Sequence, residues 1–169
     1  MDIILAVDKN WGIGNNGQLL ASIPEDLERF KRITTGHVVV MGRKTFDSLP
    51  IKPLPDRHNV VITSHGDDLP DGVFSYPSVE AFIGDLNQFI LNNFTLGWFP
   101  NVYVIGGASI VEQLIPYCQS ALITKIDKEF EADTHILNLD ESEEWTHSIV
   151  SGELHYEDLT FTYNLYKRA

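Results

Sequence analysis

The sequence predicts an α/β fold in which a mainly parallel sheet is covered by helices on both faces. Short apolar runs rich in β-branched residues alternate with segments whose apolar residues recur at helical spacing. None of the runs alternates cleanly between apolar and polar residues, which is typical of strands buried on both faces. Strands separated by helices need crossover connections, and these join parallel strands. The length of 169 residues predicts one domain, 1–169.

The first two thirds of the chain supply the expected parallel strands and their helices. Strands are expected at 3–7, 37–41, 59–63 and 102–105. A helix is expected from Ser22, because Ser22 and Glu25 enclose an early proline as in a capping box. Ser78 is expected to cap a second helix, and residues 109–115 form a third that ends at Pro116.

The last third of the chain has a different pattern. Residues 121–126 and 159–166 are strand-like, and no long helical pattern separates them. An antiparallel pair at one edge of the sheet is the simplest arrangement. The segment 92–101, which contains Gly97, Trp98 and Pro100, is expected to be an exposed loop.

Composition excludes several classes of protein. Acidic residues outnumber basic ones by 24 to 12, which argues against a nonspecific nucleic-acid binder. No apolar run reaches the ~18 residues that a membrane span needs. The single cysteine, Cys118, fits a reducing compartment, and the first eight residues lack a basic leader, so we expect a cytoplasmic protein. The six histidines show no metal-ligand spacing, so no metal is expected.

Asp26 and Phe30 are the first candidate ligand-binding pair. Four residues apart on a helix, they share one face. The carboxylate can accept two parallel hydrogen bonds from an amidine-like edge, while the aromatic ring packs against a flat heterocycle. The alternative is that Asp26 only complements the positive end of its helix, and spacing alone leaves both interpretations open.

Two strand ends carry residues suited to an anion. The strand at 37–41 is followed by Gly42 and then by two cations and a hydroxyl at 43–45, where a helix begins. Backbone amides and cations at such a junction suit a phosphate, although a solvated basic turn is equally compatible. The residues at 63–65 follow the next strand, and both ends meet at one anion if the two strands are neighbours.

A glycine pair and an arginine complete the candidates. Gly106 and Gly107 follow a strand and precede a helix, so a ligand can approach the backbone there; a tight turn is the alternative. The pair lacks the spacing of a dinucleotide-binding fingerprint. Arg57 follows a proline-bounded loop and can clamp a carboxylate, unless it is simply a surface arginine.

Together these motifs resemble the dihydrofolate reductase family along nearly the whole chain. The matching segments are 6–8 with 13–14, then 23–31, 41–46, 54–57, 105–107 and 133–134. No single motif is decisive, but their order and spacing together are specific. The resemblance implies an eight-stranded, mostly parallel mixed sheet with an antiparallel C-terminal edge and flanking helices. It also implies that NADPH and 7,8-dihydrofolate bind in a shared cleft, with antifolates as inhibitors and no nucleic-acid or membrane partner.

The resemblance implies a mechanism centred on Asp26. Hydride passes from the nicotinamide C4 to the pteridine C6, and N5 gains a proton. Asp26 is expected to bind N3 and the 2-amino group, with Thr124 supporting that edge through water. Because such a carboxylate does not touch N5, water is expected to deliver the proton. Burial against Leu27 and Phe30 is expected to raise the pKa of Asp26 against the opposing helix dipole.

The resemblance also implies the remaining contacts. The expected substrate-binding residues are Ile4, Ala6, Leu27, Phe30, Leu49, Leu54, Arg57, Ile105 and Thr124. The expected cofactor-binding residues are Ala6, Ile13, Gly42, Arg43, Lys44, Thr45, Thr63, Ser64, His65, Gly106, Gly107, Ala108, Ser109 and Ile110. The basic cluster favours the 2′-phosphate of NADPH. A cis peptide is expected within the glycine pair, and a mobile loop at 15–21.

The sequence departs from the family pattern at two places. Leu20 and Ala21 stand where a Pro-Trp pair is usual, and Ser109 and Val111 stand where a basic and an aromatic residue are common. Two alternatives therefore remain: a pyrimidine reductase of the riboflavin-pathway type, and a non-catalytic pteridine- or nucleotide-binding protein of the same fold. A monomer is expected, because no additional apolar surface segment is evident.

Overall fold

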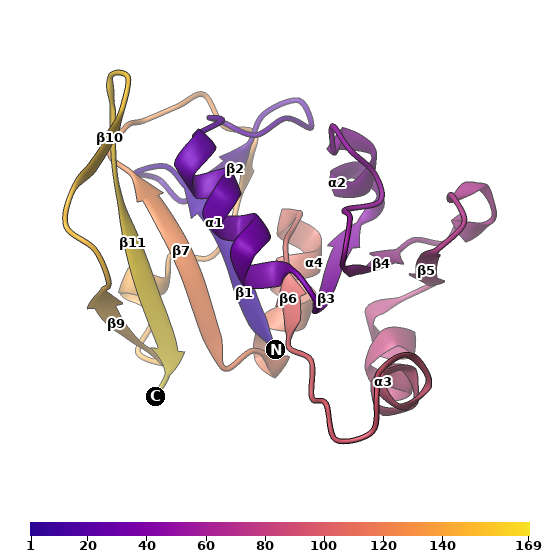
Figure 1. The fold of residues 1–169 in the computed structure, drawn as a ribbon. Helices are drawn as coiled ribbons and strands as arrows, with labels where there is room; N and C mark the ends of the chain where they lie inside the picture. Colours follow the sequence, from indigo (N-terminus) through magenta and orange to yellow (C-terminus); the bar gives the residue numbers. More distant parts are fainter.

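The computed structural model covers residues 1–169 and contains a twisted central sheet with helices packed on it (Figure 1). The strands of this sheet are β1 (Asp2–Val7), β3 (Val38–Gly42), β4 (His58–Ile62), β5 (Val73–Tyr76), β6 (Val102–Val104), β7 (Ser120–Ile126), β9 (Trp145–Ile149), β10 (Leu154–Tyr156) and β11 (Leu159–Arg168). Eight of them follow the order β10-β11-β7-β1-β6-β3-β4-β5, and β9 also pairs with β11. A separate small sheet contains β2 (Gly12–Gly14) and β8 (Thr134–His135).

Strand directions confirm the predicted fold class. Each neighbouring pair from β7 through β1, β6, β3 and β4 to β5 is parallel. β11 is antiparallel to β7, β9 and β10, which makes the C-terminal edge antiparallel as expected. The four longer helices are α1 (Pro24–Thr34), α2 (Arg43–Ser48), α3 (Val79–Asn93) and α4 (Ala108–Leu114).

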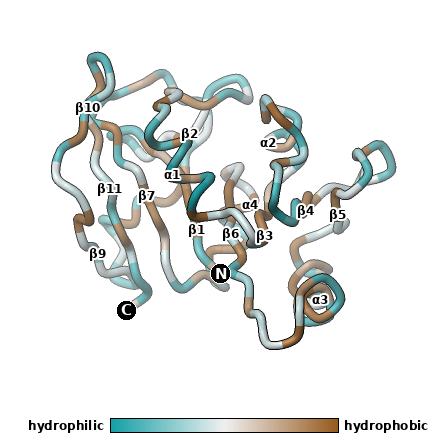
Figure 2. The backbone as a smooth tube through the Cα atoms, in the orientation of Figure 1, coloured by the Kyte–Doolittle hydropathy of each residue, from teal (hydrophilic) through white to brown (hydrophobic).

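The helices cover opposite faces of the sheet, with a separate apolar cluster on each side. α3 and α4 contribute residues such as Phe82 and Leu114 to a large cluster that includes Ile3 and Val40 of the sheet. α1 and α2 pack on the other face, where alternate strand residues such as Val39 point. Hydrophobic stretches accordingly recur along the strands and helices, whereas several of the outer loops are hydrophilic (Figure 2).

The sequence predicts the start of α3 correctly and the start of α1 incorrectly. Ser78 caps α3 as expected, because its hydroxyl accepts a 3.1 Å hydrogen bond from the amide of Ala81. The capping box at Ser22 is wrong, because Ile23 is the N-cap of α1 and makes no side-chain cap bond. Ser22 lies one residue too early, and Pro24 starts the helix at the position where a missing N–H costs nothing.

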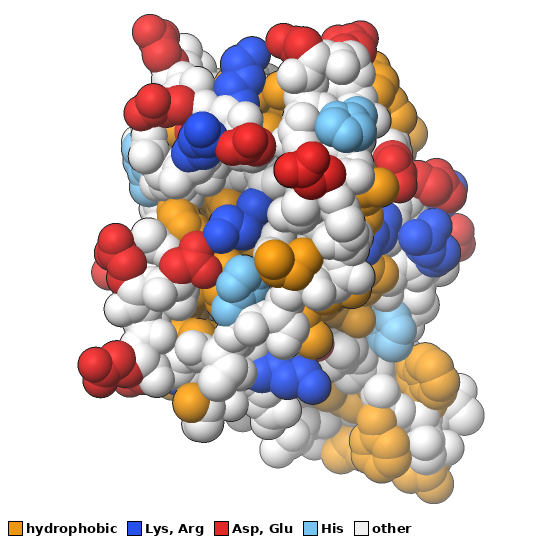
Figure 3. Space-filling model, turned by 90° about the vertical axis from the view of Figure 1, so that its left-hand side faces the viewer, with side chains coloured by type: hydrophobic (Ala, Val, Ile, Leu, Met, Phe, Trp, Pro, Cys, Tyr) orange, Lys and Arg blue, Asp and Glu red, His pale blue; other side chains and the backbone are white.

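The surface carries an apolar segment that the sequence interpretation overlooked. Between α3 and β6, Leu96 is 92% exposed and Phe99 is 86% exposed, with Trp98 beside them. Hydrophobic side chains gather at the lower corner of the molecule where this segment lies (Figures 1 and 3). The absence of an apolar surface segment, from which a monomer was expected, is therefore wrong. The exposed loop is as predicted except at its start, because α3 extends to Asn93. None of the helices combines the length and the hydrophobicity that a bilayer crossing requires.

Candidate active site

A short hydrogen bond joins α1 to the sheet at Asp26. The Thr124 hydroxyl on β7 donates to Oδ1 of Asp26 at 2.6 Å. Thr124 is buried, and it pairs in register with Ala6 on one side and Tyr163 on the other. Residues in register share a face of the sheet, so these three side chains form a row beneath the first turn of α1. Thr124 therefore contacts the carboxylate of Asp26 directly, and its water-mediated support of a ligand stays a prediction.

Burial governs the acidity of Asp26. Loss of solvent raises the pKa of this carboxyl above its ordinary value, and the hydrogen bond from Thr124 and the charge of Arg29 oppose the shift. The expected direction is confirmed. Leu27, which we expected to help bury the carboxyl, is itself 44% exposed.

An apolar wall continues from Asp26 along the same face. Phe30, Leu49 and Leu54 pack against a cluster that contains the buried side chains of Ile4 and Ile105. All five were expected at the substrate, and the fold brings them together although they come from widely separated segments. Ala6 belongs instead to a neighbouring cluster with Ala21, as its place in the row beside Thr124 requires.

Arg57 lies at the opposite end of this wall. Its Nε donates to the carbonyl of Pro55 at 2.8 Å, and its Nη1 donates to the Thr34 hydroxyl at 3.2 Å. The guanidinium carbon lies 5.9 Å from the centroid of the Phe30 ring. Partial burial lowers the pKa of Arg57, and the charge of Asp56 opposes the shift. These contacts hold the guanidinium in place and leave Nη2 for a ligand.

Asp26, Phe30 and Thr34 follow one another at intervals of four residues along α1. They therefore lie on one face of the helix, and the first and last of them are about 12 Å apart along its axis. A carboxylate stands at one end of this face, an aromatic ring in the middle, and Arg57 at the far end through its contact with Thr34. The arrangement suits an elongated ligand with a cationic or donor edge and an anionic tail.

The glycine pair lies against the end of β3. The amide of Gly42 donates to the carbonyl of Gly106 at 3.0 Å, and the peptide between Gly106 and Gly107 is cis, as expected. A Cβ on either residue of the pair would contact the Thr45 hydroxyl at about 3.5 Å. A Cβ on Gly42 would lie 3.1 Å from the side chain of Ile110, which is a tight contact. Backbone, a hydroxyl and the start of α4 therefore meet at one place, which a flat or anionic group can approach closely.

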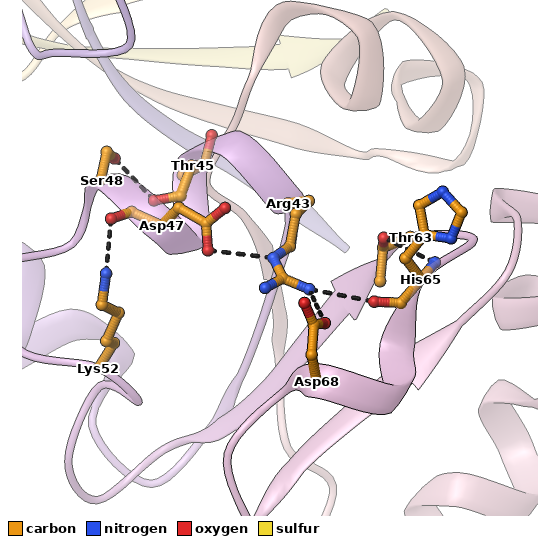
Figure 4. A network of polar contacts seen from close by, with 8 residues as sticks. All are labelled: Arg43, Thr45, Asp47, Ser48, Lys52, Thr63, His65 and Asp68. Carbon is orange, nitrogen blue, oxygen red and sulfur yellow. Dashed lines mark hydrogen bonds and ion pairs between the residues drawn. The ribbon is translucent and has the colours of Figure 1, made fainter.

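The basic turn forms a polar network rather than a free cluster of cations (Figure 4). β3 and β4 are parallel neighbours, so the two strand ends converge as expected. Arg43 donates through Nε to Asp47 at 3.0 Å and through Nη1 to Asp68 at 2.6 Å and to the His65 carbonyl at 3.1 Å. The Thr63 hydroxyl accepts from the amide of His65.

Sequence reasoning missed the two acids of this network. Asp47 follows Arg43 by four residues in the helical segment, so the spacing of an ion pair was present in the sequence. Asp68 comes from a separate 3-10 turn, Gly66–Asp68, and no local pattern indicates its contact with Arg43.

The remaining candidates lie around these features. Lys44, Ser64 and His65 are exposed, and Ile13 on β2 is partly buried. Ala108, Ser109 and Ile110 form the first turn of α4, directly after the glycine pair. Two surface hollows of about 340 and 390 Å³ are lined mostly by other residues, among them Lys9 and Leu137. Ala108 lines the second, and neither contains Asp26. No group of three or more His, Cys, Asp or Glu side chains is placed to hold a metal ion.

The fold and this arrangement define a ligand-binding α/β domain whose site lies along α1 and the ends of the central strands. The model of the family described as "Dihydrofolate reductase" matches residues 1–168. The chain therefore belongs to the dihydrofolate reductase family.

Individual relatives agree with this assignment. The dihydrofolate reductase of Bacillus subtilis (strain 168) is 39% identical over 153 residues, which cover 90% of this chain and 83% of the relative. The dihydrofolate reductase HdrB of Haloferax volcanii is 39% identical over 135 residues, which cover 78% of this chain and 68% of the relative. The dihydrofolate reductase of Mycobacterium leprae (strain TN) is 37% identical over 127 residues, which cover 74% of this chain and 71% of the relative.

Proposed function

We propose that the chain reduces 7,8-dihydrofolate to 5,6,7,8-tetrahydrofolate with NADPH. The observation that carries the proposal is the face of α1 on which Asp26, Phe30 and the Arg57 contact follow one another. Dihydrofolate has matching parts: a donor-rich pteridine edge, an aromatic middle and an anionic glutamate tail. Membership of the dihydrofolate reductase family supports the same assignment.

At the pteridine end, Asp26 binds N3 and the 2-amino group through its two carboxylate oxygens. The Thr124 hydroxyl holds Oδ1 and so orients the carboxylate. Because the pKa of Asp26 is raised, the side chain keeps its proton to a higher pH than an exposed aspartate does. In this proposed binding mode the carboxylate of Asp26 contacts N3 and the 2-amino group but does not contact N5, so water carries the proton to N5. Antifolates are proposed to bind the same carboxylate.

At the other end, Phe30, Leu49 and Leu54 pack against the aminobenzoyl ring. Arg57 pairs with the α-carboxylate of the glutamate through the part of its guanidinium that faces away from Pro55 and Thr34. The contacts that fix Arg57 before the ligand arrives lower the entropy cost of this ion pair.

The glycine junction and the basic turn fit a nicotinamide dinucleotide. Side-chain-free backbone at Gly42, Gly106 and Gly107 lets the cofactor approach closely, and the Thr45 hydroxyl lies at the same place. Arg43 and Lys44 supply positive charge for its phosphates. A bound NADPH supplies the hydride that the pteridine C6 receives. The protein is further proposed to act as a cytoplasmic monomer.

Purified protein mixed with NADPH and dihydrofolate tests the function directly. We expect loss of the reduced nicotinamide absorbance and formation of tetrahydrofolate. Turnover of an aminopyrimidine ribitol phosphate instead of dihydrofolate would indicate the pyrimidine reductase. Saturable binding of both ligands without turnover would leave only a carrier function.

A further inference from the structure

Two carboxylates already occupy the arginine of the basic turn (Figure 4). Asp68 lies 2.6 Å from Nη1 of Arg43, and Asp47 lies 3.0 Å from Nε. The Arg43 hydrogen bond holds the pKa of Asp68 below its ordinary value, and both acids raise the pKa of Arg43. The charge of Arg43 is therefore balanced by carboxylates before any ligand binds, whereas the exposed Lys44 forms no ion pair.

The two acids have different origins and different effects. Asp47 stands four residues after Arg43 on α2 and binds the inner nitrogen. Asp68 comes from the turn after β4 and binds Nη1 at the tip of the guanidinium. A Cβ on Gly66 would clash with Ser75 of β5, so the start of this turn lies close against β5. The 70% exposed side chain of Asp68 thus stands where an incoming anion would meet Arg43.

A phosphate and a hydroxyl interact differently with the Arg43–Asp68 pair. A phosphate that binds Arg43 must displace the Asp68 carboxylate or lie beside it, and both cost free energy through repulsion between anions. A ribose hydroxyl can donate a hydrogen bond to the same carboxylate, as an acidic residue does in proteins that bind the unphosphorylated cofactor.

We propose that Asp68 weakens the preference of this chain for the 2′-phosphorylated cofactor, by competing with the 2′-phosphate for Arg43. The 2′-phosphorylated nicotinamide dinucleotide still binds more tightly than the unphosphorylated one, but Asp68 makes this difference in affinity smaller. The inference rests on the proposed function, because it assumes that the cofactor's adenosine end binds at the basic turn.

Asp68→Asn tests the inference, and Asp67→Asn is its matched control. Asp67 is exposed and precedes Asp68 in the same turn, but it makes no ion pair with Arg43. Asp67→Asn therefore removes one negative charge from the turn without removing a contact to Arg43. Calorimetric titration with adenosine 2′,5′-bisphosphate and with adenosine 5′-monophosphate isolates the contribution of the 2′-phosphate. The same proteins are titrated with NADPH and NADH.

In Asp68→Asn we expect the bisphosphate and NADPH to bind roughly three- to tenfold more tightly, since the gain corresponds to release of an exposed ion pair and relief of repulsion. Binding of the monophosphate and NADH should stay the same or weaken. In Asp67→Asn, binding of the bisphosphate should change by less than about twofold, and this change should shrink with added salt.

Equal tightening in both variants would overturn the inference, because it would show a general charge effect. Unchanged bisphosphate affinity in Asp68→Asn would overturn it as well, while leaving the proposed function intact if the wild type binds NADPH. A wild-type protein that binds none of the four ligands would overturn the cofactor assignment and the inference together.

Discussion

The Thr124 hydroxyl lies 2.6 Å from Oδ1 of Asp26, and this hydrogen bond connects two residues separated by 98 positions in the chain. It joins the first turn of α1 to the centre of β7. Asp26 therefore does more than complement a helix dipole, since its carboxylate is anchored to the sheet from which the site is built. Five predictions concern this anchor and the residues around it.

Replacing Asp26 by Asn removes the proton but keeps an oxygen that can accept from Thr124. Turnover at neutral pH should fall by about 10²–10⁴-fold, the range that a positioned acid contributes. Binding of NADPH, measured by fluorescence, should be unchanged. Glu28→Gln is the control, because Glu28 is an exposed acid on the same helix. Wild-type turnover in Asp26→Asn would exclude Asp26 from the chemistry.

The same variant changes the pH dependence of stability. Because burial raises the folded pKa of Asp26 above its ordinary value of 3.8, the folded state binds this proton more tightly than the unfolded state. The stabilisation is complete below the unfolded pKa and is lost as pH rises through the folded pKa. Urea unfolding should therefore show Asp26→Asn gaining stability relative to the wild type between acid and neutral pH. A difference independent of pH would contradict this.

Thr124→Val removes the hydroxyl that opposes the effect of burial on Asp26. The pKa of Asp26 should rise further, so the fall of the hydride-transfer rate with pH should move to higher pH. Thr124→Ser retains the hydroxyl and should restore the wild-type profile. If the rate profile of Thr124→Val coincides with that of the wild type, the hydrogen bond does not tune the acid.

Arg57→Lys tests the anionic end of the site. A lysine cannot offer the planar fork of a guanidinium, so KM for dihydrofolate should rise by roughly tenfold or more with a smaller change in kcat. A dihydropteroate substrate without the glutamate should show little difference. Arg32→Lys, at an exposed position on α1, is the matched control. An equal rise in KM for both substrates would assign Arg57 a structural role instead.

Two buried tyrosines on β11 provide a stability test. The Tyr163 hydroxyl has no hydrogen-bond partner, whereas the Tyr166 hydroxyl donates to Asp140 at 2.7 Å. Tyr163→Phe should leave the free energy of unfolding unchanged or raise it by up to ~1 kcal/mol, and Tyr166→Phe should lower it by about 1 kcal/mol. Denaturant unfolding measures both. A loss of stability in Tyr163→Phe would show that its hydroxyl has a partner in solution.

Local sequence patterns predicted most of the sheet and the kinds of residue at the site. The apolar run before Gly42 and the helical spacing after Ser78 identify β3 and α3, because burial on both faces and amphipathicity leave clear signatures. The short β5 was missed, since none of its four residues is fully buried and they carry little pattern. The family motifs supplied the cis peptide at Gly106, which no periodicity indicates.

What the sequence determined by itself was the fold class, the family and the identity of a few candidate residues, because these depend on local periodicity and on motif order. The tertiary structure decided which of them act together. Thr124 meets Asp26 only when β7 lies under α1, and Asp68 meets Arg43 only when the turn after β4 folds back on α2. Contacts between distant segments depend on strand order and packing, and these are properties of the whole chain that no short pattern encodes.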